Sequence, residues 1–244
     1  MARKMTRGAL IFFLVLVMHS PLLAQDSHWT DEAELSFVQT KGNTDLVNLS
    51  ARNIFKYKFS EKIAGSWKIA ALYGKTDGDK TAENYSTELR GDYLFTERFY
   101  ASALAGWLRD KFSGIESRLY GGPAIGYKFL IGPVHLLSAE IGVLYAREDY
   151  TDETDDSFLE GRAMGVYEFM FTEKSRFSQS AEFLYDFGDS ENYSVLSETA
   201  LISEMNGYLS LKASYIVDYD HQPTPETLKE TDTKLGVTLI INFR

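Results

Sequence analysis

One histidine near the end of the chain has a neighbour that general-base chemistry could use. His221 directly follows Asp220, and a carboxylate beside an imidazole can orient the ring and stabilise its protonated form. His28 comes before the first expected strand and His135 near a short turn. No serine is spaced to act with His221, no histidine pair has metal-ligand spacing, and no glycine-rich phosphate loop is present. We therefore interpret His221 as a solvated loop residue and predict no enzyme activity and no catalytic, cofactor or metal site.

Six carboxylates gather in one short stretch of the chain. They are Glu148, Asp149, Asp152, Glu153, Asp155 and Asp156. Carboxylate oxygens at this density suit Ca²⁺ or Mg²⁺, but the ligand order of a calcium loop, with its turn glycine, is missing. We interpret residues 148–156 as a solvated acidic outer loop, with weak binding of a divalent cation as the alternative.

A larger set of charged side chains recurs at every second position between apolar residues. If these segments are strands of a barrel, the charges share its inner face. One interpretation is a ladder of salt bridges that props the barrel open or plugs it, and the other is a polar pathway whose charges select solutes. The two are compatible. The lumen-lining candidates are Arg52, Lys68, Glu88, Arg90, Asp92, Arg118, Glu140, Glu160, Arg162, Glu182, Glu198, Lys212, Asp218 and Lys234, and the same assignment includes Lys56, Glu168, Asp186 and Asp232.

The elements that must position these charges are β-strands. Apolar and polar residues alternate with a period of two in 47–59, 63–73, 85–95, 209–219 and 235–243. This period is typical of a strand with two unlike faces. Aromatic residues make up 14% of the chain, which suits strands better than helices.

A repeated turn divides the strands into hairpins. Residues 59–62, 95–98 and 171–174 carry the same Phe-Ser/Thr-Glu-Lys/Arg turn, and 131–133 and 205–207 fill two further positions. Eleven connections indicate about twelve strands. The other connections are expected to be mostly longer and more polar loops, near residues 41–45, 76–82, 110–116, 149–156, 187–191 and 221–230. Short turns on one side and long loops on the other predict an all-β fold, a transmembrane antiparallel up-and-down β-barrel.

The outward aromatic residues distinguish a membrane barrel from a soluble barrel or sandwich. They cluster at the two strand ends, for example Tyr57 and Phe59 at the short turns and Tyr73 and Tyr215 at the long loops. Two such belts around an apolar band are typical of barrels in a bilayer. About twelve strands are also too many to close an apolar interior, since about eight already leave just enough room for side chains. Pro123 falls within a strand, and we expect a bulge there because proline lacks a ladder donor.

The start of the chain has the order of a secretory signal peptide. Arg3, Lys4 and Arg7 precede an apolar run over 8–18, and we expect cleavage after Ala24. Loss of these three cations takes the net charge from −10 to −13, which argues against a nucleic-acid partner. The chain has no cysteine. The expected organisation is a signal peptide over 1–24, a short segment over 25–30 and an outer-membrane barrel over 31–244.

Several short motifs resemble a known family over about residues 31–243. They include 40–44, 109–115, Gly122, Gly126 with Tyr127, the residues around Glu140 to Glu148, and 231–233. The chain resembles the salt-induced outer-membrane protein family, and this resemblance implies an outer-membrane barrel without an assigned activity. Such chains end on an aromatic residue, whereas here Arg244 follows Phe243. The last strand, ending at Phe243, still has the pattern that the barrel-assembly machinery recognises, so this machinery and outer-membrane lipid are the expected partners.

The function expected from these features is a narrow, cation-favouring pore or an envelope-stress barrel related to salt or osmotic load. The alternatives are a non-conducting scaffold barrel and an outer-membrane hydrolase that uses His221. A barrel of about twelve strands lies between filled eight-stranded barrels and open channels of 16–18 strands. Bulky inward residues should narrow it further, namely Tyr100, Leu104, Tyr120, Leu144 and Met164. Acids dominate the lumen and loops, so cations should be favoured.

Overall fold

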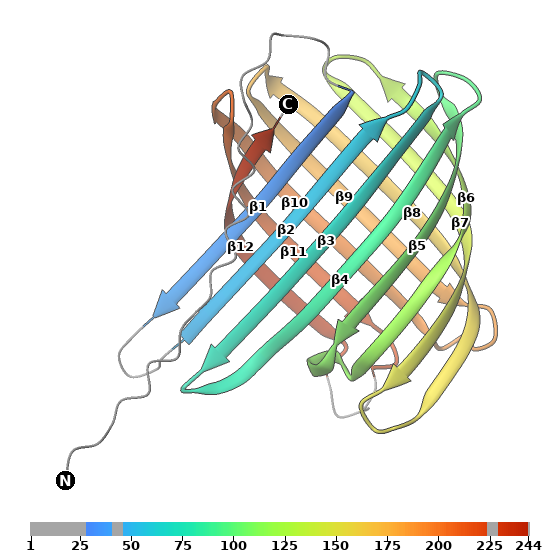
Figure 1. The fold of residues 1–244 in the computed structure, drawn as a ribbon, viewed down its shortest axis with the longest axis vertical. Helices are drawn as coiled ribbons and strands as arrows, with labels where there is room; N and C mark the ends of the chain where they lie inside the picture. The colour runs from blue at the N-terminus through green and yellow to red at the C-terminus, as the bar shows by residue number, and fades with distance from the viewer. Residues whose placement is uncertain (1–27, 41–45, 224–228, 244) are drawn as a thin grey trace.

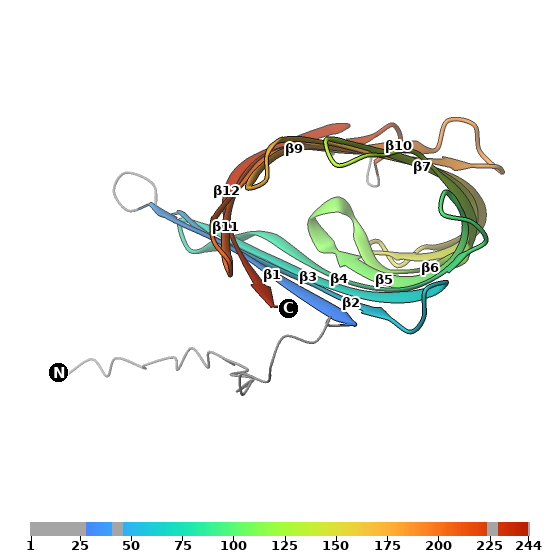
Figure 2. The ribbon, with the colours of Figure 1, turned by 90° about the horizontal axis from the view of Figure 1, so that it is seen from above.

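The computed structural model describes residues 28–40, 46–223 and 229–243. In this part of the chain twelve antiparallel strands form one closed barrel, with β12 paired back to β1 (Figures 1 and 2). The predicted fold is confirmed. The signal peptide over 1–24, motif residues 41–44 and Arg244 lie outside the described residues. The strands are β1 Trp29–Thr40, β2 Leu46–Lys58, β3 Ile63–Thr76, β4 Asp79–Leu94, β5 Phe99–Asp110, β6 Ile115–Ile131, β7 His135–Tyr150, β8 Asp155–Thr172, β9 Ser175–Asp186, β10 Tyr193–Asn206, β11 Leu209–Asp220 and β12 Thr231–Phe243.

The short turns lie at one end of the barrel, together with the start of β1 and the end of β12. Trp29 pairs with Tyr57, and Asp31 pairs with Phe243. We call this the short-turn end and the opposite one the long-loop end. Within the described residues, no helix is long and apolar enough to cross a membrane.

The repeated turns share one hydrogen-bonding device, which explains their sequence. The hydroxyl of Ser60 accepts from the backbone N–H of Ile63 at 3.1 Å, and that of Thr96 accepts from Phe99 at 2.9 Å. In the third copy the Thr172 hydroxyl accepts from the Lys174 N–H at 3.1 Å. A Ser or Thr hydroxyl that satisfies nearby backbone donors stabilises such turns.

Two of the sequence expectations about connections are wrong. Residues 76–82 do not form a long loop, because β3 ends at Thr76 and β4 begins at Asp79. Asp77 and Gly78 have φ values of 51° and 95°, the left-handed pair that a two-residue hairpin turn requires. The loop expected over 149–156 is also shorter, because β7 continues to Tyr150 and β8 starts at Asp155.

The bulge expected at Pro123 is also absent. The β6–β7 register is the same on both sides, where Gly121 faces Tyr145 and Ala124 faces Gly142. The register shifts of this pair lie elsewhere, at 115–117 and 128–130. Pro123 keeps its place opposite Ala103 of β5. The missing proline donor therefore interrupts the β6–β7 pairing locally without inserting an extra residue.

The barrel wall has one polar and one apolar face. Through the body of the strands the even-numbered residues point inward, as shown by ion pairs that join strands that are not neighbours, such as Arg90 of β4 with Glu140 of β7. Register shifts near some strand ends break this parity, for example where Leu130 pairs with Leu137. Odd-numbered residues point outward. At the short-turn end they form edge-to-face aromatic pairs with ring centroids about 5 Å apart. These pairs are Tyr57–Phe59, Tyr93–Phe95, Tyr127–Phe129 and Phe169–Phe171.

Candidate functional site in the barrel lumen

The middle of the lumen is crossed by ion pairs centred on Glu140 of β7. Both terminal nitrogens of Arg90 donate to this carboxylate, at 2.5 and 3.0 Å, and Arg162 of β8 donates at 2.8 Å. Each arginine has a second acid partner, Asp92 at 2.8 Å for Arg90 and Glu182 at 2.5 Å for Arg162. We call these five residues the central network. Glu140 and Arg162 are 6% and 8% exposed, so removing one partner would leave a buried charge uncompensated.

Four charges form a second network beside the junction of β1 and β12. Glu34 of β1 accepts from Arg52 at 2.5 Å and from Lys212 of β11 at 2.6 Å. Glu198 of β10 lies 3.2 Å from Lys212 and 3.8 Å from Arg52. We call Glu34, Arg52, Glu198 and Lys212 the seam network. Its two positive and two negative charges balance, and it spans four strand boundaries.

A third group lies nearer the long-loop end. Arg118 of β6 contacts Glu148 of β7 and donates to Glu160 of β8 at 2.7 Å. Both carboxylates are buried, at 5% and 2% exposure. We call these three residues the outer network. A weaker pair, Lys68 with Glu88 at 3.8 Å, lies on β3 and β4.

Two inward tyrosines lie along the wall because glycines make room for them. A Cβ added to Gly126 would come 2.1 Å from the ring of Tyr100, and one added to Gly106 would come 2.4 Å from the ring of Tyr120. These rings therefore lie over glycines of the adjacent strands, and they narrow the bore less than the sequence suggested. The Arg90 guanidinium lies 6.0 Å from the Tyr100 ring centroid. Gly126 thus positions Tyr100, whose ring supports Arg90 of the central network.

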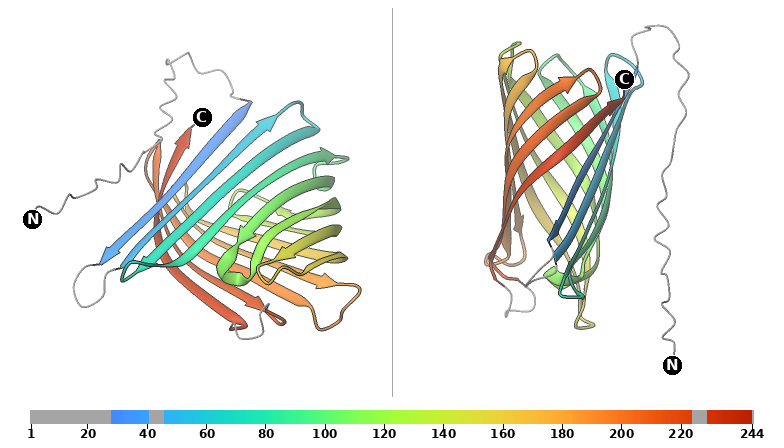
Figure 3. Two further views of the ribbon diagram at one scale, coloured as in Figure 1. Left: turned by 60° about the horizontal axis from the view of Figure 1, so that its bottom comes forward. Right: turned by 90° about the vertical axis from the view of Figure 1, so that its left-hand side faces the viewer.

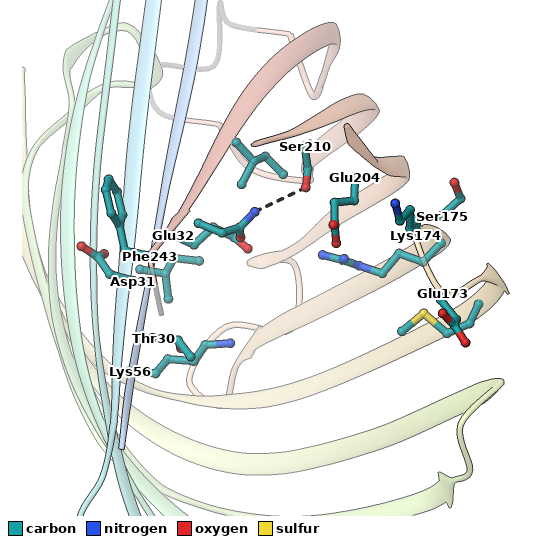
Figure 4. A pocket seen from close by; sticks show the side chains of 15 residues that line it. Thr30, Asp31, Glu32, Lys56, Glu173, Lys174, Ser175, Glu204, Ser210 and Phe243 are labelled. Atoms are coloured by element: carbon teal, nitrogen blue, oxygen red, sulfur yellow. Dashed lines mark hydrogen bonds between the residues drawn. The ribbon is translucent and has the colours of Figure 1, made fainter. Parts of the chain in front are cut away.

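Cavities open at both ends of the lumen. The one at the short-turn end has about 300 Å³ and carries charges of both signs, with Lys56 and Glu204 on opposite sides of it (Figure 4). The Asn242 amide donates to the Ser210 hydroxyl there at 3.3 Å. The cavity at the long-loop end has about 220 Å³. The two cavities share no lining residue, and the central network lines neither of them.

The long-loop end of the lumen, which we call the outer vestibule, carries carboxylates of a different kind. Asp156, Asp186 and Asp220 line its cavity, and the inward Asp218 faces Asp232 directly across β11 and β12. None of these five acids has an ion-pair partner within 4 Å among the described residues. Backbone and amide donors contact some of them without neutralising them. The vestibule therefore presents uncompensated negative charge.

The structure separates the six acids of the expected outer loop. Glu148 is the clearest correction, since its side chain points into the lumen and contacts Arg118. Asp149 and Asp155 lie 3.8 and 3.7 Å from the outward Arg147. Asp152 accepts from the Thr154 backbone and hydroxyl within the turn. The described part of the chain contains no group of three or more His, Asp or Glu residues arranged to hold a metal ion.

His221 lies among aromatic residues at the long-loop end. Its Nδ1 lies 2.8 Å from the Tyr219 hydroxyl, its Nε2 lies 3.3 Å from Glu191, and its ring stacks on Tyr193 at 4.6 Å. The adjacent Asp220 points into the vestibule instead. The residue pair that suggested general-base chemistry is thus divided between the two faces of the wall.

Most of the charges singled out in the sequence meet ion-pair partners on the inner face of the wall. Arg52, Arg90, Asp92, Arg118, Glu140, Glu160, Arg162, Glu182, Glu198 and Lys212 belong to the three networks, and Lys68 and Glu88 pair with each other. Asp218 and Lys234 have no ion pair among the described residues. Two network members, Glu34 and Glu148, were not assigned to the lumen. The alternation of Ala33, Leu35 and Phe37 with polar residues would have placed Glu34 there.

The sequence comparison decides the family. A family model described as a protein of unknown function, DUF481, matches residues 33–243. The chain belongs to this family. An Escherichia coli (strain K12) relative, the uncharacterized protein YdiY, is 27% identical over 203 residues, which cover 83% of this chain and 79% of the relative. Neither description mentions salt, so the link to salt stays a prediction.

Solved outer-membrane barrels share the fold of this DUF481 chain. The COG4313 outer membrane channel from Pseudomonas putida F1 has a TM-score of 0.54 and 11% identity, over 90% of this chain and 97% of that one. The translocator domain of the autotransporter NalP from Neisseria meningitidis has a TM-score of 0.51 and 11% identity, over 88% and 87% of the two chains. The NanC porin has a TM-score of 0.50 and 9% identity, over 87% and 97%.

Proposed function

We propose that this protein is an outer-membrane β-barrel that forms a narrow channel favouring small cations. Its outer face supports a bilayer setting, because apolar residues there lie between aromatic rows at both strand ends. Its fold is shared with outer-membrane channels and porins. The signal peptide expected over 1–24 would direct export. The barrel-assembly machinery would recognise β12, which ends at Phe243.

The observation that carries the proposed selectivity is the contrast in charge pairing along the lumen. In the central network every charge has an opposite partner within 3 Å, and two arginines against three acids leave a net charge of only −1. In the outer vestibule Asp218, Asp220 and Asp232 have no such partner among the described residues. Unpaired acids in a narrow mouth raise the local concentration of cations, and salt screens this effect.

The proposed conductance is small because side chains occupy the middle of the bore. Leu104 and Leu144 point inward and are 5% and 2% exposed, and they face Arg90 of the central network and Glu160 of the outer network, respectively, on the neighbouring strands. Water and small ions would pass beside fixed ion pairs, whereas larger solutes would not.

Reconstitution into planar bilayers under a KCl gradient tests this proposal. We expect small unit conductance steps. The reversal potential should have the sign of a cation-selective channel, and its magnitude should decrease as total salt rises. Large steps with anion selectivity that salt does not change would contradict it, and so would the absence of any conductance.

A non-conducting scaffold is the second candidate function, and the buried ion pairs of the central network favour it. Such a barrel would stabilise the envelope, and a role under salt or osmotic stress belongs to this candidate as much as to the channel. We do not propose hydrolase activity, because His221 contacts Tyr219 and Glu191 and not a nucleophile. Weak binding of a divalent cation at residues 148–156 stays a prediction.

A further inference from the structure

The junction that closes the barrel is paired over only half of its length. β1 and β12 share five register pairs, from Asp31–Phe243 to Leu35–Leu239. Further towards the long-loop end, β1 pairs with β2 as far as Thr40, and β12 pairs with β11 as far as Thr231. Among the described residues, 36–40 of β1 have no register partner on β12, and the Ser36 hydroxyl donates to the backbone carbonyl of Val237 at 3.1 Å where the paired half ends. There the two strands diverge (Figures 1 and 3).

The side chains along this unpaired stretch are apolar and exposed. Leu235 and Val237 of β12 are 84% and 61% exposed, and Phe37 of β1 is 62% exposed. Val38 shares the inward face of β1 with Glu34, yet it is 49% exposed. By contrast, the inward Ile240, in the paired half of the junction, is 1% exposed. A closed wall would cover Val38 in the same way.

The lumen beside this stretch combines apolar surface with negative charge. Leu196 of β10 faces inward and is 45% exposed, and Ile216 of β11 lies on the same side of the wall. Asp218 and Asp232 come next to them in the outer vestibule. An apolar body with a positively charged group would match both features.

We propose that the unpaired half of the β1–β12 junction is a lateral opening, through which a small amphipathic cation passes between the outer vestibule and the bilayer. Open sheet edges are not tolerated against hydrocarbon, but irregular backbone is tolerated where it lines a water-filled cavity. The vestibule supplies that cavity. The inference rests on the proposed function for its membrane setting and adds a substrate class and a route.

Lipid access to a lumen-facing position tests the opening. The chain has no cysteine, so single cysteines can be introduced and labelled with a small fluorophore in vesicles of doxyl-labelled phosphatidylcholine. Val38→Cys reports on the opening and Leu235→Cys on the outer face. Ser86→Cys, an inward position in the fully paired strand β4, is the lumen control.

We expect the lipid quencher to reach the label at Val38 nearly as well as the label at Leu235, and several-fold more than the label at Ser86. A Val38 label quenched only as much as the Ser86 label would overturn the lateral opening while leaving the channel intact. An unquenched Leu235 label would instead remove the membrane setting on which the proposed function rests.

The substrate class is tested with two ions of matched shape and opposite charge. Tetraphenylphosphonium should slow the reaction of Leu196→Cys with a neutral maleimide several-fold, whereas tetraphenylborate should not. Equal protection by both ions, or by neither, would overturn the amphipathic-cation assignment.

Discussion

The central network and the outer vestibule both place acids on the inner face of the barrel, but the two regions differ in how the charges of these acids are satisfied. Glu140 is buried between Arg90 and Arg162, with distances of 2.5 and 2.8 Å. Asp218 faces another acid, Asp232, and has no cation within 4 Å among the described residues. In the central network, ion pairs join β4, β7, β8 and β9 on the inner face of the barrel. At the mouth, charge is left available to solutes.

This difference separates structural roles from functional ones within one lumen. Substitutions in the central network should change stability first, because a broken buried pair leaves a desolvated charge. Substitutions in the vestibule should change ion preference and leave stability nearly unchanged.

Replacing Glu140 by Ala should have the largest effect on stability. Arg90 and Arg162 would both lose a buried partner, and such losses cost about 3–5 kcal/mol in the free energy of unfolding. Urea unfolding in lipid vesicles measures this cost. A loss below about 1 kcal/mol would mean that water already satisfies these arginines and that the central network is not structural.

A charge on the outer face should be nearly as costly. Leu239→Arg places an arginine outward in the middle of β12, and a lipid-facing arginine near the midplane costs about 2–4 kcal/mol. Heat-modifiable migration on gels would show failed assembly. Lys234→Gln, inward on the same strand, is the matched control and should assemble normally. Equal behaviour of the two variants would reverse the assignment of inner and outer faces.

Crowding the tyrosine that supports the central network should have a smaller effect. Gly126→Ala brings a Cβ against the Tyr100 ring, and overpacking of this kind costs about 1–3 kcal/mol. Gly165→Ala is the control, since nothing lies within 4 Å of its added Cβ. If the two variants unfold at the same urea concentration, Tyr100 can move away freely and does not support Arg90.

The vestibule acids should matter least for stability. Asp218→Asn combined with Asp232→Asn removes two like charges that face each other, so the free energy of unfolding should change by no more than about 0.5 kcal/mol. A loss of unfolding free energy comparable to that of Glu140→Ala would show that these acids have structural partners. The division of roles between the central network and the outer vestibule would then be wrong.

The sequence predicts the barrel well because its signals are local. The two-residue period assigns Arg90 and Glu140 to the inner face, and the turn hydroxyls of Ser60 and Thr96 mark hairpins. The Asp77–Gly78 turn was also readable from its dipeptide, although polar residues around it suggested a longer loop. Such errors affect boundaries and not the fold.

The partners within the lumen are not predictable in this way. Which arginine meets Glu140 depends on how twelve strands are staggered around the barrel, and no local pattern encodes this. The acidic residues next to Glu148 indicate a loop, although its even number places its side chain in the lumen. The half-paired junction of β1 and β12 joins the first and last strands of the barrel, so no local sequence pattern indicates how far they pair.

The most direct test of the division is a bilayer recording that measures unit conductance and reversal potential together. It compares the wild type with the Asp218→Asn and Asp232→Asn double variant under a KCl gradient. We expect the reversal potential to move towards zero while the unit conductance changes little, because the vestibule acids determine the ion preference and the side chains in the middle of the lumen determine the width of the bore. An unchanged cation preference in the double variant would contradict it.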